Sequence, residues 1–146
     1  MHAYYSSRNK SFLILGLLPG SIQPSFAQQP AKPTASSDTK EEGLRQTAAR
    51  TLNSLGVVYF EKQQFQKAIT ALEDALKYDP GNQDMRTNLG MVYFQQSQFN
   101  KVVETLTEVS RTRPTDQRVL TALAVAHFAE GRYSEAASFY EKLAPL

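Results

Sequence analysis

The chain carries a pattern that recurs every 34 residues, and this period limits the folds open to it more than any other feature. Pro80 and Pro114 lie one period apart, and so do Gly56 and Gly90. Between these positions the apolar residues recur at the three- and four-residue spacing of one helix face. A repeat of this length, made of two helices and a turn, builds an array in which each unit packs on its neighbours.

The chemistry of the recurring residues predicts how each helical hairpin packs. Gly56 and Ala68 are small where the two helices of the first unit are expected to cross, so their backbones can approach closely. Pro80 ends the second helix, because proline has no amide hydrogen and restricts the residue before it. No hairpin can bury its apolar face alone, so the units must share one core.

The pattern resembles the tetratricopeptide repeat. In the first unit it is carried by Leu52, Leu55, Gly56, Tyr59, Phe65, Ala68, Leu72, Ala75 and Pro80. The second unit keeps Leu89, Gly90, Tyr93, Phe99, Leu106 and Pro114, and the third keeps Leu120, Leu123, Ala124, Gly131, Tyr133, Ala136 and Tyr140. The resemblance implies an all-α fold, in which three stacked helix-turn-helix hairpins form a short right-handed superhelical solenoid. The units are residues 49–82, 83–116 and 117–146, and the third is short, with no separate capping helix.

The first 27 residues have the features of a secretory signal peptide. Arg8 and Lys10 make the start basic, residues 12–18 are apolar, and Ser25-Phe26-Ala27 offers small residues around a cleavage point. We expect cleavage after Ala27 and no stable membrane insertion of the mature chain. A retained anchor is the alternative, but a membrane span needs about 20 apolar residues, which this stretch does not supply.

Residues 28–48 are expected to form a flexible linker that leads into the first helix. Their first part contains Pro30 and Pro33 and no large apolar residue that could pack. Thr39 and Glu42 have the spacing of a helix-capping box, but Gly43 weakens the turns that follow. We therefore expect firm helix only from about Ala49.

Composition argues against an enzyme and against several kinds of site. The chain has no cysteine, which excludes disulfides, thiolate catalysis and iron–sulfur clusters, and it has only two histidines, His2 and His127. His127 stands where the first two units have Tyr59 and Tyr93, and we interpret it as a packed aromatic residue with one satisfied nitrogen. The sequence thus predicts no catalytic residue, no metal site and no cofactor.

The charge distribution argues against a nucleic-acid partner. The net charge is +2, and Arg8 and Lys10 account for it, since the first 27 residues contain no acidic residue. The rest of the chain is therefore neutral. A neutral surface lacks the sequence-independent attraction for phosphates on which nucleic-acid binding depends.

Matching residues on the first helix of each unit predict a binding groove. Stacked hairpins curve, so that their first helices line a concave inner face. Each first helix carries an aliphatic and an aromatic residue beside a small polar one, and the expected groove set is Asn53, Val57, Phe60, Thr87, Met91, Phe94, Thr121, Val125 and Phe128. An apolar stripe with a polar rim suits the apolar face of a helix or an extended peptide.

Charged positions complete the expected groove. Arg50, Asp84 and Arg118 form a row of alternating charge, and Asn88 is the one amide of the middle unit on this face. One subclass of the family grips the terminal carboxylate of chaperone tails with a set of Lys, Arg and Asn residues. The expected groove lacks this set, and Asn88 is the only amide of the middle unit that fits its pattern, so the resemblance does not imply such a clamp.

These observations predict an exported interaction module, periplasmic or secreted, that binds a protein or peptide segment in its groove as a scaffold or assembly factor. A structural role is the alternative, with homo-oligomers forming through the third hairpin, or the chain being a truncated fragment of a longer repeat protein. The third hypothesis is that the chain is an enzyme. Its only close carboxylate pairs, such as Glu104 with Glu108, have the spacing of a solvated helix face, which argues against a catalytic pair.

Overall fold

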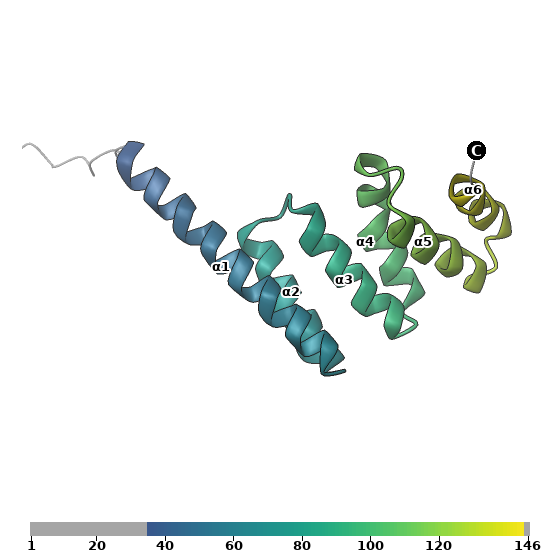
Figure 1. Cartoon of the computed structure of the whole chain (residues 1–146), viewed down its shortest axis with the longest axis horizontal. Helices are drawn as coiled ribbons and strands as arrows, with labels where there is room; N and C mark the ends of the chain where they lie inside the picture. Colours follow the sequence, from purple (N-terminus) through teal and green to yellow (C-terminus); the bar gives the residue numbers. More distant parts are fainter. Residues whose placement is uncertain (1–34, 145–146) are drawn as a thin grey trace, which may run out of the picture. The chain divides into compact units, whose positions relative to one another are not determined.

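The computed structural model describes residues 35–144 and shows six helices arranged as three consecutive hairpins (Figure 1). The helices are α1 (Ala35–Glu61), α2 (Phe65–Tyr78), α3 (Gln83–Gln95), α4 (Phe99–Thr112), α5 (Gln117–Ala129) and α6 (Tyr133–Leu143). Each helix packs on the next one along the chain. The expected all-α hairpin stack is confirmed, whereas the expected signal peptide lies outside the described residues.

Helix α1 begins well before the expected boundary at Ala49. It runs from Ala35, so the part of the expected linker from residue 35 to residue 48 is helical, and Figure 1 shows α1 extending past α2. Residues 38–47 are exposed, so tertiary packing does not cause this extension. The segment is rich in Lys, Glu, Gln and Arg, which favour helix, and lengthening a helix that already exists requires no new nucleation. Gly43 weakens such a helix without breaking it.

The turn inside each hairpin repeats the same unusual backbone. Gln63, Ser97 and Gly131 occupy one repeat position, and all three have positive φ, at 57°, 55° and 75° respectively. The following amide closes each turn, as when that of Gln64 donates to the carbonyl of Tyr59 at 2.9 Å. Only the third hairpin uses glycine there, although glycine alone adopts this conformation without steric cost.

Local signals also define the boundaries between hairpins. Helix α2 ends before Asp79 and Pro80, as proline's restriction of the preceding residue requires. The next helix is capped by Asn82, whose side-chain oxygen accepts from the amide of Met85 at 3.1 Å. Asp116 caps α5 in the same way through the amide of Arg118 at 3.0 Å.

Glycine permits the close contact between the two helices of each of the first two hairpins. A Cβ atom on Gly56 would lie 2.6 Å from the Cγ of Leu72, and one on Gly90 would lie 2.5 Å from the Cγ of Leu106. Both leucines are fully buried. The residue that faces Gly56 most closely is therefore Leu72, with the carbonyl of Ala68 further away at 3.4 Å.

The interface between the first two hairpins combines apolar burial with polar contacts. Leu89 and Val92 of α3 belong to the same buried cluster as Leu72 of α2. In the interface between the first two hairpins, the hydroxyl of Tyr93 donates to Glu73 at 2.8 Å. Burial and this contact with Glu73 raise the pKa of Tyr93, so the phenol stays protonated and keeps donating.

Although α1 has 27 residues, no helix within residues 35–144 is both long and apolar enough to cross a bilayer.

Candidate functional site

The first helices of the three hairpins lie along one side of the stack, where α3 contacts both α1 and α5. Two hollows open on this side and share Met91 and Arg118. The first has a volume of about 270 Å³ and is lined by Val57, Phe60, Glu61, Leu72, Asn88, Met91, Val92 and Arg118. The second has a volume of about 320 Å³ and is lined by Met91, Phe94, Gln117, Arg118, Thr121 and Ala122. We call these two hollows together the inner groove.

The inner groove contains many of the residues that the sequence pattern predicted. Those that line it are Val57, Phe60, Asn88, Met91, Phe94, Arg118 and Thr121. The expected set did not contain five further lining residues, which are Glu61, Leu72, Val92, Gln117 and Ala122. The positions of two of them offer a signal, because Glu61 lies one helical turn after Val57 and Gln117 directly precedes Arg118.

Other predicted groove residues lie elsewhere. Thr87 is only 1% exposed and its hydroxyl donates to the carbonyl of Gln83 at 2.8 Å, so it is a core residue and its expected place in the groove is wrong. The remaining five do not line either hollow; Arg50, Asp84 and Phe128 are exposed, and Asn53 and Val125 are half-buried.

The aromatic residues of this side are held by a contact that repeats in each hairpin. Phe60 meets Phe65 edge-on at a ring-centroid distance of 5.9 Å, and Phe94 meets Phe99 in the same way at 6.4 Å. Phe128 pairs with Tyr133 at 5.3 Å, but its side chain is 59% exposed. The first ring of each pair is thus oriented by the start of the following helix and remains partly accessible.

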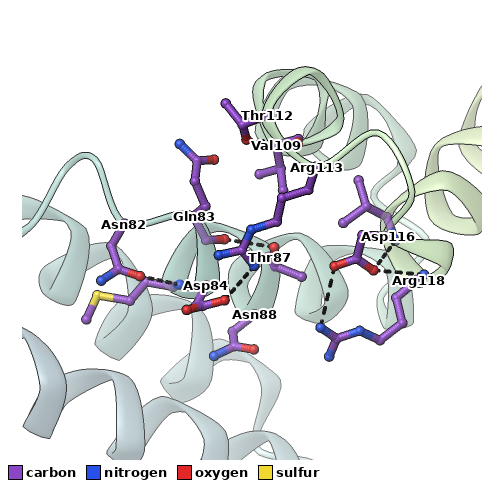
Figure 2. A network of polar contacts seen from close by, with 12 residues as sticks. Asn82, Gln83, Asp84, Thr87, Asn88, Val109, Thr112, Arg113, Asp116 and Arg118 are labelled. Carbon is purple, nitrogen blue, oxygen red and sulfur yellow. Dashed lines mark hydrogen bonds and ion pairs between the residues drawn. The ribbon is translucent and has the colours of Figure 1, made fainter.

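The three residues of the expected row of alternating charge, Arg50, Asp84 and Arg118, form no ion pair with one another. Figure 2 shows Arg113, at the end of α4, reaching Asp84 on α3, and the two side chains are 2.6 Å apart. The Arg113 guanidinium holds the pKa of Asp84 below its usual value. Arg118 lies 3.7 Å from Asp116, the residue that caps its own helix.

An amide pair joins the first two hairpins beside the groove. The Asn88 side chain donates to the side-chain oxygen of Asn53 at 3.0 Å, from α3 to α1. One of the Asn88 amide hydrogens is therefore engaged within the protein, although Asn88 still lines the first hollow.

His127 packs as an aromatic residue. It is 6% exposed, and its ring stacks on Phe139 at a centroid distance of 5.4 Å. Its Nδ1 is buried without a hydrogen-bond partner among the described residues, and burial, followed by the charge of Arg132, lowers its pKa. The ring is thus favoured in its neutral form. Within residues 35–144, no three side chains of His, Cys, Asp or Glu form a group that could hold a metal ion.

A sequence model described as the tetratricopeptide repeat matches residues 59–126. This range runs from the end of α1 into α5 and includes all of α2, α3 and α4. No protein in a search of curated sequences matches the chain.

Solved structures share the fold. The first such domain of Spaghetti (RPAP3), bound to the HSP90 peptide SRMEEVD, is 23% identical with a TM-score of 0.62, over 66% of this chain and 77% of that one. The Arabidopsis OM64 domain is 18% identical with a TM-score of 0.62, over 66% and 80% of the two chains. A crystal structure of MamA is 26% identical with a TM-score of 0.62, over 73% of this chain and only 63% of MamA.

Proposed function

Because residues 59–126 match the tetratricopeptide repeat model, we propose that the chain is a protein-interaction module without catalytic activity, whose inner groove binds a segment of another protein. The observation that carries this proposal is the inner groove itself, which α1, α3 and α5 line with side chains from all three hairpins. Two adjoining hollows formed by several repeats suit an extended or helical segment better than they suit a small compact ligand.

The lining of the groove favours an apolar segment. Phe60, Met91 and Phe94 provide aromatic and thioether surface in its lining, and methionine adapts its shape to varied apolar groups. Asn88 and Thr121 add hydrogen-bonding groups to the lining. We infer that the bound segment presents two or more large apolar side chains on one face.

The electrostatics of the groove do not favour a strongly acidic tail. The domain of Spaghetti binds a peptide that contains two glutamates and an aspartate. In this chain the nearby guanidinium of Arg113 is engaged by Asp84, Arg118 has Asp116 beside it, and Glu61 adds a negative charge to the lining. A carboxylate in the groove would compete with these internal partners.

Binding is tested by replacing Phe94 with alanine and measuring capture of peptides from an array of short apolar segments. An interface aromatic residue at the centre of a patch contributes about 2 kcal/mol or more, which is about a thirtyfold loss of affinity. The control is Tyr78→Ala, because Tyr78 is an exposed aromatic residue on α2 that lines neither hollow.

Thermal melting of the same variants distinguishes binding from folding. We expect Phe94→Ala to lose binding more than it loses stability, because Phe94 is only half-buried. If the folded Phe94→Ala protein captures the same peptides as the wild type, the inner groove is not the binding site.

We further propose that the module acts outside the cytoplasm, in the periplasm or as a secreted protein. The basic start and the apolar stretch of residues 12–18 support this proposal, as does Ser25-Phe26-Ala27. Intact mass spectrometry of the exported protein should give a chain that begins at Gln28. Recovery of uncleaved chain in the membrane fraction would show instead that the segment is an anchor.

A further inference from the structure

The first and last hairpins expose repeat positions that are buried elsewhere in the stack. Leu55 and Val58 on α1 are 40% and 41% exposed, whereas the equivalent Leu89 and Val92 on α3 are 6% and 1% exposed. In the third hairpin these positions are fully buried as Leu123 and Ala126. Every hairpin has its own second helix, so what α1 lacks within residues 35–144 is the cover of a preceding hairpin.

We call this uncovered surface of α1 the leading face; it comprises Thr51, Leu55, Val58 and Tyr59. A hollow of about 310 Å³, lined in part by Leu52, Leu55 and Ala71, opens beside it. Leu44, on the extension of α1, is 63% exposed and lies three turns from Leu55, on the same side of the helix. The leading face therefore presents an apolar surface to solvent.

The opposite end exposes a complementary surface, the trailing face, which comprises Ala137, Tyr140, Glu141 and Ala144. Tyr140 is 46% exposed, whereas its equivalents in the first two hairpins, Leu72 and Leu106, are fully buried. Ala137 is also exposed, although Ile69 at the same repeat position is 5% exposed. Within the part of the chain that the structure describes, no following hairpin covers the trailing face.

We propose that a second copy of this chain covers these surfaces, with the leading face of one copy on the trailing face of another. The structure already contains this arrangement twice, where α3 packs on α2 and α5 packs on α4. A second copy would place its α1 on α6 in the same way. This self-association is separate from binding in the inner groove.

The polar residues at the two ends match those of an interior interface. Tyr93 donates to Glu73 between the first two hairpins, at 2.8 Å. The equivalent positions at the free ends are Tyr59 on the leading face and Glu141 on the trailing face. A copy stacked in register would therefore form the same tyrosine–glutamate hydrogen bond. The interface between the second and third hairpins lacks this bond, because Thr107 and His127 occupy the two positions there.

The charges at the rim are also complementary. Lys101 and Glu130 line one hollow where the second hairpin meets the third. At the free ends, Glu135 on α6 occupies the repeat position of Lys101, and Lys62, which follows α1, occupies that of Glu130. A contact between two copies would therefore again pair a positive with a negative side chain, with the two charges exchanged. Like charges there would oppose stacking, and opposite charges select this register.

The test uses the full chain and two variants, Leu55→Glu on the leading face and Tyr140→Glu on the trailing face, in analytical ultracentrifugation. A head-to-tail contact leaves a free face at each end, so the mass of the wild type should rise with concentration beyond that of a dimer, unless a ring closes. Each variant alone should remain monomeric. An equimolar mixture should form dimers and nothing larger, because one intact leading face meets one intact trailing face.

Controls separate the contact from folding and from added charge. Ser138→Glu places the same charge on α6 at an exposed position where the second hairpin carries Glu104, and it should associate like the wild type. Circular dichroism should show both face variants folded; if Leu55→Glu unfolds, Val58→Glu replaces it. Glu141→Gln should weaken association by about tenfold, through loss of a charged hydrogen bond.

Three results would overturn the proposal. The first is a wild-type chain that is monomeric at every concentration. The second is association that Leu55→Glu abolishes and Tyr140→Glu leaves intact, which would indicate a symmetric contact between two leading faces. The third is a mixture of the two variants that stays monomeric. Peptide capture by the inner groove is measured separately, so failure of either proposal is distinguishable from failure of the other.

Discussion

The interior interfaces and the two ends of this molecule are built from the same repeat positions, yet the environments of those positions differ. Leu89 in the interior is 6% exposed, while Leu55 at the free end of the stack is 40% exposed. The amino acid and the position within the repeat are identical. In a stacked array, a neighbouring hairpin therefore provides the burial of an apolar residue.

This difference also predicts how stability is distributed. Interior residues such as Leu106 and Val92 belong to a single buried cluster that includes residues of α2, α3, α4 and α5. Removing an interior contact therefore weakens two hairpins together, and three hairpins are close to the minimum that such arrays need. A change at an end face weakens only one hairpin.

The largest expected effect comes from filling a close interior contact, in Gly90→Leu. The new Cβ alone would lie 2.5 Å from the Cγ of buried Leu106. Because the rest of the leucine side chain must also be accommodated, we expect a cost above the about 1 to 3 kcal/mol typical of overpacking, and above that of truncating a buried leucine. We expect cooperative loss of helicity across the stack in a thermal melt followed by circular dichroism.

The control for that substitution is Gly43→Leu, in the exposed extension of α1. A Cβ atom there meets nothing within 4 Å, so the same chemical change should leave stability equal or higher. A melting curve for Gly90→Leu that matches the wild type would contradict the close packing of α3 on α4.

The next effect compares Leu89→Ala with Leu55→Ala, two identical changes at one repeat position. Truncating a buried leucine costs about 2 to 5 kcal/mol, so Leu89→Ala should be strongly destabilising. Leu55→Ala should cost about 1 kcal/mol or less in dilute solution, where no second copy covers it. Denaturant unfolding measures both, and equal losses would show that Leu55 is covered within the monomer.

A smaller effect is expected from Tyr93→Phe compared with Tyr59→Phe. The first change removes the hydrogen bond to Glu73 and should cost about 1 kcal/mol. The second removes a hydroxyl that has no hydrogen-bond partner among the described residues, and the change in stability should stay within about 0.5 kcal/mol. A loss for Tyr59→Phe that appears only at high protein concentration would instead indicate the contact with Glu141 of a second copy.

The smallest expected effect is a dependence of stability on pH, which arises at the interface between the second and third hairpins because His127 lies there. His127 takes the position of Tyr93, and burial, followed by Arg132, lowers its pKa, while Glu130 and Glu135 oppose this shift. The unfolded chain then binds a proton more readily than the folded chain, so stability should fall as the pH drops below about 6.5. Denaturant titrations at pH 7.5 and 5.5 measure the loss, which His127→Phe should reduce.

The fold could be predicted well from the sequence because its signals are local and periodic. The spacing of Gly56 and Gly90 indicates the two close helix contacts, and Pro80 and Pro114 indicate where the second helices end. The extension of α1 does not follow from these signals, because the prolines and Gly43 argue against helix while the residues between 38 and 48 favour it. That segment is exposed and depends on helix propensity alone.

The candidate groove could be predicted only in part. Periodicity places Val57, Met91 and Phe94 on the inner side correctly, because helix geometry determines which residues share a face. Thr87 and Thr121 occupy one repeat position, yet Thr87 is buried and Thr121 lines the groove. Their different neighbours in the stack decide this, and no local pattern contains those neighbours.

The sequence by itself determined the helical hairpins, their 34-residue period and the chemical character of each helix face, because these depend on residues within one or two turns of each other. Only the tertiary structure decided that Asp84 pairs with Arg113 and not with a member of its own row. It also decided that Leu89 is buried while Leu55 is not. The physical reason is that burial and ion pairing depend on groups brought together from distant parts of the chain, which local periodicity does not specify.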